Sequence, residues 1–195
     1  MPTQTSPIDT RLDARAFSRR APADKVLHYE LTVVAASAVD VVESIGGWLF
    51  DRQKAGWDVT VLLADLAGER ALHILGLTVV EFGGEWPVVR DDPETDATLA
   101  ISGEVLVADD PVRDQALSAL RAKSSEVAMW GERCRAHLGA TAQPVEYRPS
   151  AAARAFKRHA LDAVGIAAPD GPVETLFCPG AWRYRGRDSD LEPVG

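Results

Sequence analysis

The stretch VVAASAVDVVESIGG, residues 33–47, decides the fold of this chain. It begins inside an apolar, β-branched run, which predicts a buried strand over Glu30–Ala36. After Ser37, apolar residues recur at three- and four-residue spacing, which predicts a helix as far as Ala55, ended by Gly56. A strand that leads directly into a helix is the opening unit of a parallel α/β sheet.

The same alternation of strand and helix continues along the chain. Apolar runs predict strands over 57–64 and 77–82, with a short helix over 69–75 between them. EVAMWG (126–131) predicts a fourth strand, PVEYR (144–148) is a candidate fifth strand, and 150–164 predicts a helix. We therefore expect an α/β fold, a Rossmann-like three-layer α/β/α architecture with a mainly parallel sheet of 4–5 strands.

Residues 97–108, ATLAISGEVLVA, are ambiguous between strand and helix. Leu99, Ile101, Val105 and Val107 alternate as in a strand, whereas Asp96 is a possible N-cap for a helix. We favour the helix slightly, because a second helix is predicted directly afterwards.

Three regions are expected. Residues 1–25 are polar, rich in Pro, Ser and Arg, and without periodicity, which predicts a mobile N-terminal arm. Residues 26–166 form the α/β domain. Residues 167–195 are rich in Pro and Gly before Trp182, which predicts an irregular C-terminal tail.

Composition excludes several classes of protein. With 195 residues and 46% hydrophobic residues, the chain is long enough to bury a core of its own. It lacks an apolar run of about twenty residues, so no membrane span is expected, and the N-terminus does not resemble a secretory signal. The two cysteines lie far apart in the sequence, which favours the cytoplasm. The net charge of −8 argues against a general nucleic-acid binder.

The expected ligand site lies beyond the carboxyl ends of the strands, where the strand order reverses. If residues 126–131 form the strand on the far side of the first strand, polar and aromatic side chains meet in one crevice. The candidate residues for this crevice are Ser37, Asp40, Asp65, Trp130, Glu132 and Arg133.

The chemistry of this crevice does not suit a nucleotide. The turn at Ala35–Ala38 has no glycine fingerprint, and the chain has no phosphate-binding loop motif. Asp40 would favour the helix dipole but repel a phosphate, and Ser37 is the natural N-cap. Cys134 and His137 share a helical spacing, yet two ligands do not make a zinc site. The sequence therefore predicts neither a cofactor nor a metal.

Five further residues are candidates for contacts with a partner. Trp86 and Trp182 lie in Gly- and Pro-rich segments, where an exposed aromatic residue often anchors an interface. Arg154, Lys157 and Arg158 are expected on the solvent side of the helix over 150–164. The partner is an unidentified protein or a second copy of the chain.

Residues 31–65 resemble the start of the LmbE-like (PIG-L) zinc deacetylases. Those enzymes open with an apolar strand, the motif A-H-P-D-D-E, a glycine pair, a helix and a second strand with A-G-x-x-V-T-V. Here Ala36, Gly46, Gly47 and the run from Ala55 to Val61 match in spacing. The metal-binding His position is Ser37 and the general-base Asp position is Val39, so the second Asp of the motif is retained, as Asp40. The resemblance implies the α/β fold and a metal-free relative without deacetylase activity.

Three functions follow from these observations. We favour a cytoplasmic binding or regulatory module that is not catalytic and has no classical nucleotide or metal site. The first alternative is a metal-independent enzyme that uses the crevice after strands one and four. The second is a nucleic-acid-associated protein that uses the basic C-terminal region.

Overall fold

The computed structural model describes residues 28–83, 95–108, 113–114, 126–134, 142–167, 171–179 and 191–193. The elements in these ranges follow in chain order. They are β1 (His28–Ser37), α1 (Ala38–Lys54), β2 (Asp58–Asp65), α2 (Glu69–Ile74), β3 (Thr78–Glu81), β4 (Thr95–Ser102), α3 (Gly103–Ala108), β5 (Glu126–Trp130), β6 (Ala142–Tyr147), α6 (Ala151–Ala163), β7 (Glu174–Pro179) and β8 (Leu191–Pro193).

The strands form one mixed sheet in the order β3-β2-β1-β4-β5-β7-β6-β8. The first five in this order are parallel to one another, whereas β7 pairs antiparallel with both β5 and β6, and β8 pairs antiparallel with β6. The predicted α/β class with a mainly parallel sheet is confirmed. The candidate fifth strand over 144–148 is confirmed as β6. The described residues contribute more strands than the 4–5 expected, because the sequence interpretation did not include β4, β7 and β8.

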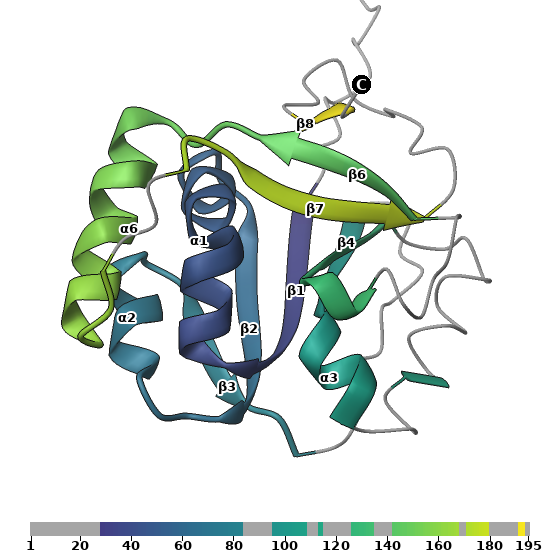
Figure 1. The fold of residues 1–195 in the computed structure, drawn as a ribbon, viewed down its shortest axis with the longest axis horizontal. Coiled ribbons are helices and arrows are strands. Elements are labelled where there is room, and N and C mark those ends of the chain that lie inside the picture. The colour runs from purple at the N-terminus through teal and green to yellow at the C-terminus, as the bar shows by residue number, and fades with distance from the viewer. Residues whose placement is uncertain are drawn as a thin grey trace, which may run out of the picture.

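Helices cover both faces of the sheet. Figure 1 shows α1, α2 and α6 on one side of β1 and β2, and α3 on the other side. Leu31, Val33 and Ala35 of β1 point towards the first group of helices, while Val34 belongs to the cluster that contains α3. This alternation follows from the two-residue period of a strand, and it gives the predicted three layers.

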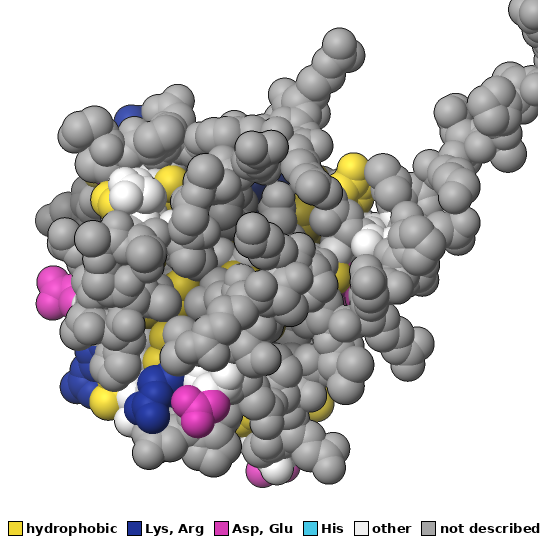
Figure 2. Space-filling model, turned by 90° about the vertical axis from the view of Figure 1, so that its right-hand side faces the viewer, with side chains coloured by type: hydrophobic (Ala, Val, Ile, Leu, Met, Phe, Trp, Pro, Cys, Tyr) yellow, Lys and Arg dark blue, Asp and Glu magenta, His cyan; other side chains and the backbone are white. Residues whose placement is uncertain are grey.

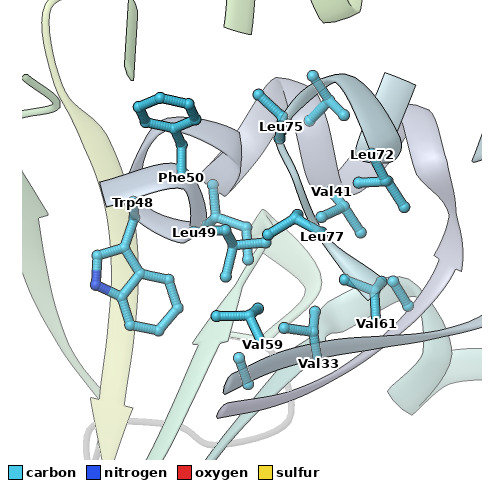
Figure 3. Close-up of a cluster of buried hydrophobic side chains, with 14 of the residues drawn as sticks. Val33, Val41, Trp48, Leu49, Phe50, Val59, Val61, Leu72, Leu75 and Leu77 are labelled. Atoms are coloured by element: carbon cyan, nitrogen blue, oxygen red, sulfur yellow. The ribbon is translucent and has the colours of Figure 1, made fainter. Parts of the chain in front are cut away.

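The larger core cluster lies between α1 and the parallel strands (Figure 3). Val41 and Leu49 of α1 lie over Val33, Val59 and Val61 of the sheet in this view. All five side chains are buried. The helical period of apolar residues in the opening stretch therefore packs on the sheet as expected.

The ambiguous segment is divided between two elements. Residues 95–102 form β4, which lies directly beside β1, and α3 begins at Gly103. The preference for helix is therefore wrong for residues 97–102 and right for 103–108. Leu99 and Ile101 are fully buried in the sheet, where β-strand pairing on both sides outweighs the local N-cap signal of Asp96.

The expected irregular tail contains two strands, so this prediction is wrong for residues 174–179 and 191–193. β7 lies inside the sheet, between β5 and β6. Its register with β6 joins Thr175 to Glu146 and Phe177 to Pro144, and Leu176 and Cys178 are fully buried. The sequence interpretation missed β7 because Pro and Gly in the preceding loop indicate irregular structure. The strand is defined by pairing with partners that are distant in sequence.

α6 is amphipathic as predicted, with one exception. Ser150 is its N-cap and accepts a hydrogen bond from the backbone N–H of Ala153 at 3.1 Å. Lys157, expected to face solvent, is buried, whereas Phe156, expected on the apolar face, is 43% exposed. An ion pair with Glu174 explains the burial of Lys157, whereas Phe156 stacks on Phe50 with 4.8 Å between the ring centroids.

Several sequence predictions fall outside the described residues. These are the arm over 1–25 and the two loop tryptophans, Trp86 and Trp182. Within the described ranges, no helix is both long and apolar enough to cross a membrane.

The glycine pair of the opening stretch allows close packing. The neighbours of Gly47 are Pro149, just before α6, and Glu174, the first residue of β7. A Cβ atom at Gly47 would lie 2.7 Å from the ring of Pro149 and 2.8 Å from Oε1 of Glu174. At Gly46 it would meet the flexible end of Leu75 at 3.3 Å. Gly47 therefore admits the start of β7 to the backbone of α1, whereas Gly46 is less constrained.

We expect Gly47→Ala to lower the free energy of unfolding. Overpacking costs about 1–3 kcal/mol, which exceeds the gain of up to about 1 kcal/mol in helix propensity. Gly46→Ala is the matched control, since Leu75 has room to yield and the propensity gain is the same. Urea denaturation of both variants measures the difference. A Gly47→Ala protein as stable as Gly46→Ala would contradict the packing argument.

Candidate functional site

The strand order reverses at β1, which has β2 on one side and β4 on the other. The carboxyl ends of β1, β4 and β5 are adjacent, and Ser102 of β4 lies in register with Trp130 of β5. The crevice is therefore at the predicted end of the sheet. The sequence interpretation placed residues 126–131 beside β1, because it did not recognise β4. In the structure β4 lies beside β1, and β5 follows on the far side of β4.

Asp40 is the centre of this crevice. Its Oδ2 accepts hydrogen bonds from Ser102 Oγ at 2.6 Å and from Trp130 Nε1 at 3.1 Å, and its Oδ1 accepts from Ser44 Oγ at 3.4 Å. Ser102 and Trp130 are buried, while Asp40 is partly exposed. Two of the predicted residues, Asp40 and Trp130, thus make direct contact across the crevice.

Ser37 has the capping role that its position predicts. It adopts an extended conformation with φ −147° and ψ 155°, and its side chain accepts from the N–H of Asp40 at 3.3 Å. This bond fixes the first turn of α1, and so directs the carboxylate of Asp40 towards β4 and β5.

The sequence interpretation missed Ser102. Its hydroxyl also accepts from the backbone N–H of Glu104 at 3.2 Å, so it begins α3 while it contacts Asp40. A helix predicted over 97–108 placed this serine inside a helix instead of at a strand end. The Ser-Gly pair at residues 102–103 was the available sequence signal, because this pair is typical of the end of a strand.

The other predicted crevice residues are exposed, and two of them make contacts elsewhere. Asp65 is exposed and accepts from the N–H of Ala67 at 2.9 Å, which is an Asx turn at the end of β2. Arg133 forms an exposed ion pair with Glu104 at 3.1 Å. Glu132 is exposed at the edge of a pocket.

This pocket has a volume of about 820 Å³ and adjoins the crevice. α1 contributes Glu43 and Ser44, and the latter connects the pocket to Asp40. The segment after β5 contributes Glu132, and the start of β7 contributes Glu174. The predicted contact residues of α6 line its opposite wall: Arg154, Lys157 and Arg158.

A buried ion pair lies in the wall of the pocket. Lys157 Nζ and Glu174 Oε1 are 2.5 Å apart, with side-chain exposures of 11% and 3%. Glu174 also accepts from the backbone N–H of Gly47 at 2.8 Å and of Trp48 at 2.7 Å. Burial raises the pKa of Glu174, against the opposing effects of Lys157 and the two N–H donors.

Cys134 is close to the crevice but is not a nucleophile. Its Sγ donates to the carbonyl oxygen of Trp130 at 2.9 Å, and the residue is fully buried. Burial, followed by the nearby charge of Asp40, raises the pKa of the thiol to about 12. The thiolate needed for nucleophilic attack is therefore scarce at neutral pH.

The resemblance to zinc deacetylases implies a metal at this end of the sheet, but the donor set does not fit one. The position of the ligand His is Ser37, whose hydroxyl caps α1. Oδ2 of Asp40 receives an indole N–H, a group with no lone pair for a cation. In the described ranges, no three His, Cys, Asp or Glu side chains are grouped so as to hold a metal ion.

α6 carries Arg154, Lys157 and Arg158 of the basic C-terminal region, and it lies on the other side of the molecule from the face drawn in Figure 2. Figure 2 faces the right-hand side of Figure 1, and there the described basic and acidic side chains are scattered rather than gathered by sign. Lys157, expected to contact a partner, is buried in its ion pair. Arg154 and Arg158 are exposed, so the alternative of a nucleic-acid-associated protein stays a prediction.

Comparisons with known proteins identify the fold. No family model and no curated protein matches the sequence significantly. Among solved structures, a triple mutant of a deacetylase of the teicoplanin biosynthetic pathway matches with a TM-score of 0.52 and 15% identity, over 82% of this chain and 100% of that chain. The A40926 pseudoaglycone deacetylase matches with a TM-score of 0.52 and 16% identity, over 80% and 97%. A deacetylase–teicoplanin complex matches with a TM-score of 0.50 and 13% identity, over 85% and 99%.

These matches confirm the resemblance to LmbE-like deacetylases at the level of the fold. They also correct the favoured function. The interpretation as a non-catalytic binding or regulatory module is wrong, because the structures that share the fold are deacetylases. That interpretation rested on missing catalytic motifs, and motifs do not report the carboxylate and hydroxyl that the fold brings together from separate elements. The alternative of an enzyme that uses the crevice fits better.

We expect Lys157→Ala to lower the free energy of unfolding by about 3–5 kcal/mol, because it leaves the carboxylate of Glu174 buried without its cation. The matched control is Glu104→Gln, which breaks the exposed pair with Arg133 and is expected to cost less than about 1 kcal/mol. Urea denaturation measures both. Equal losses in the two variants would contradict the importance of burial.

Native Cys134 should resist alkylation by iodoacetamide at pH 8, since its thiol remains protonated well above that pH. In urea, where the protein is unfolded, both Cys134 and Cys178 should react. Peptide mass spectrometry distinguishes the two sites. Rapid labelling of Cys134 in the folded protein would show that the thiol is accessible and ionised.

Proposed function

We propose that this protein is an enzyme that deacylates a polar small molecule, without a bound metal, in the crevice at the ends of β1, β4 and β5. One observation carries the proposal: Ser102 and Trp130 hold the carboxylate of Asp40 at the switch point, beside a pocket. Ligands of doubly wound sheets bind at this position.

The two oxygens of Asp40 have different environments. Oδ2 is held by two donors, at 2.6 and 3.1 Å, whereas Oδ1 has one longer contact, at 3.4 Å, with Ser44. Because Ser44 lines the pocket, Oδ1 is the oxygen nearer to a bound substrate. Asp40 is therefore the proposed general base, and Ser102 and Trp130 are positioning residues.

The proposed reaction is hydrolysis. Oδ1 of Asp40 accepts a proton from a water molecule, and the resulting hydroxide adds to the acyl carbonyl carbon. The bond from that carbon to the amide nitrogen or ester oxygen of the substrate then breaks. Asp40 returns the proton to this leaving group, so that the products are a carboxylic acid and a free amine or alcohol.

Two further observations support deacylation. The solved structures with this fold are deacetylases, one of teicoplanin biosynthesis and one named for the A40926 pseudoaglycone. The pocket volume of about 820 Å³ lies within the range of about 300–1,000 Å³ that is usual for small-molecule sites.

We also propose that the enzyme works in the cytoplasm. Both cysteines are buried and far apart in the sequence, and a chain with so few cysteines is usual in a reducing compartment.

Asp40→Asn is expected to lower kcat/KM by at least about 100-fold, because an amide does not accept the proton from water. Release of the acyl group from a panel of N- and O-acetylated amino sugars and glycopeptides measures this, with chelator-treated protein. Asp58→Asn is the matched control, since Asp58 is exposed at the start of β2, at the other end of the strand. Thermal unfolding confirms that each variant is folded.

Three outcomes would contradict the proposal. The first is absence of turnover across the panel. The second is turnover by Asp40→Asn at the rate of the unaltered protein. The third is activity that disappears with a chelator and returns with Zn²⁺, which would restore the metal-dependent chemistry of the fold.

A further inference from the structure

We infer that the α6 wall of the pocket binds an oxyanion, a carboxylate or a phosphate, carried by the small molecule. This inference rests on the proposed function, because it takes the pocket to be the substrate site. It adds the class of substrate, which the carboxylate at the switch point does not determine.

Three cations of α6 face the pocket together. Arg154, Lys157 and Arg158 are spaced by three and four residues, which places them on one side of a helix. All three line the pocket.

The three cations differ in what they already contact. Lys157 is neutralised by Glu174 inside the wall. Arg154 donates from Nη1 to the carbonyl oxygen of Pro149 at 2.6 Å, which orients its guanidinium and leaves its other N–H groups available. Arg158 is exposed and has no ion pair within the described part of the chain.

The acids of the pocket do not satisfy these arginines. Glu43 of α1 and Glu132 after β5 line the pocket as well, yet neither forms an ion pair with another described residue. Arginines and carboxylates therefore line one cavity without an ion pair between them among the described residues. Such a cavity suits a ligand with an oxyanion at one end and hydroxyl or amino groups at the other.

The chemistry of arginine explains the preference for an oxyanion. A guanidinium presents parallel N–H donors that match two oxygens of a carboxylate or phosphate. Glu174 does not supply an oxyanion to these arginines, because its oxygens accept hydrogen bonds from Lys157, Gly47 and Trp48. The anion has to come from the ligand.

A concave site of this size favours a small molecule over a nucleic acid. Lys157 lies in the wall with 8% exposure, so it does not reach a phosphate backbone outside the pocket. The net charge of the protein is −8, which repels a polyanion but acts weakly on a ligand with one charged group.

Calorimetric titration of the full chain with glucose, glucose 6-phosphate and glucuronic acid tests the inference. At least one of the two anionic sugars is expected to bind about tenfold or more tightly than glucose. The preferred sugar identifies the oxyanion, since the two carry phosphate or carboxylate at the same carbon. Equal affinity for all three, absence of binding by both anions, or tighter binding of a single-stranded oligonucleotide would overturn it.

Variants locate the binding site. Arg158→Gln is expected to weaken binding of the preferred anionic sugar by about tenfold or more, and Arg158→Lys by less, since it keeps the charge and loses the paired donors. Arg70→Gln, at an exposed position of α2 that does not line the pocket, is the matched control. Unchanged affinity in Arg158→Gln would overturn the assignment to α6.

The same titration with Asp40→Asn separates this inference from the proposed function. Binding of the anionic sugar should persist in that variant, because Asp40 is not among the residues that line the pocket with Arg158. A preference for the anion that depends on Arg158, in a protein without deacylase activity, would retain the oxyanion site and remove the proposed reaction. Turnover without any preference for the anion would retain the proposed reaction and remove the oxyanion site.

Discussion

The carboxylate of Glu174 is the constraint on which the rest of the structure depends. It receives the N–H groups of Gly47 and Trp48 from α1 and the ammonium of Lys157 from α6. One buried group thus joins two helices to the first residue of β7. Burying a carboxylate is costly unless its charge and hydrogen bonds are satisfied, so these partners are required together.

This anchor shapes the pocket as well as the core. β7 enters the sheet between β5 and β6, and the loop before it closes one side of the cavity beside α6. α1 takes part twice, with Asp40 in its first turn and Gly47 in its middle. The helix that begins the fold therefore positions both the proposed base and the wall of its pocket.

The chain shares its fold with deacetylases of teicoplanin and of the A40926 pseudoaglycone. Ser37 caps the helix, and Ser102 and Trp130 offer donors to Asp40. Hydrogen-bond donors around a carboxylate stabilise its negative charge, as a metal cation would. Unlike a metal ion, they do not polarise the carbonyl group of a substrate. Changes to the donor set leave the strand–helix–strand unit intact, because that unit is stabilised by apolar packing.

Local pattern determined the first half of the fold. β-branched runs, the N-cap Ser37 and the helical period up to Gly56 depend on neighbouring residues, so they predicted β1, α1 and β2, and they placed Asp40 and Trp130 in one crevice. Tertiary structure decided β4, β7, the burial of Lys157 and the contact of Ser102 with Asp40. Each of these depends on strand pairing or charge pairing between residues distant in sequence. Such pairing is not encoded in the local pattern, which was ambiguous between strand and helix at β4.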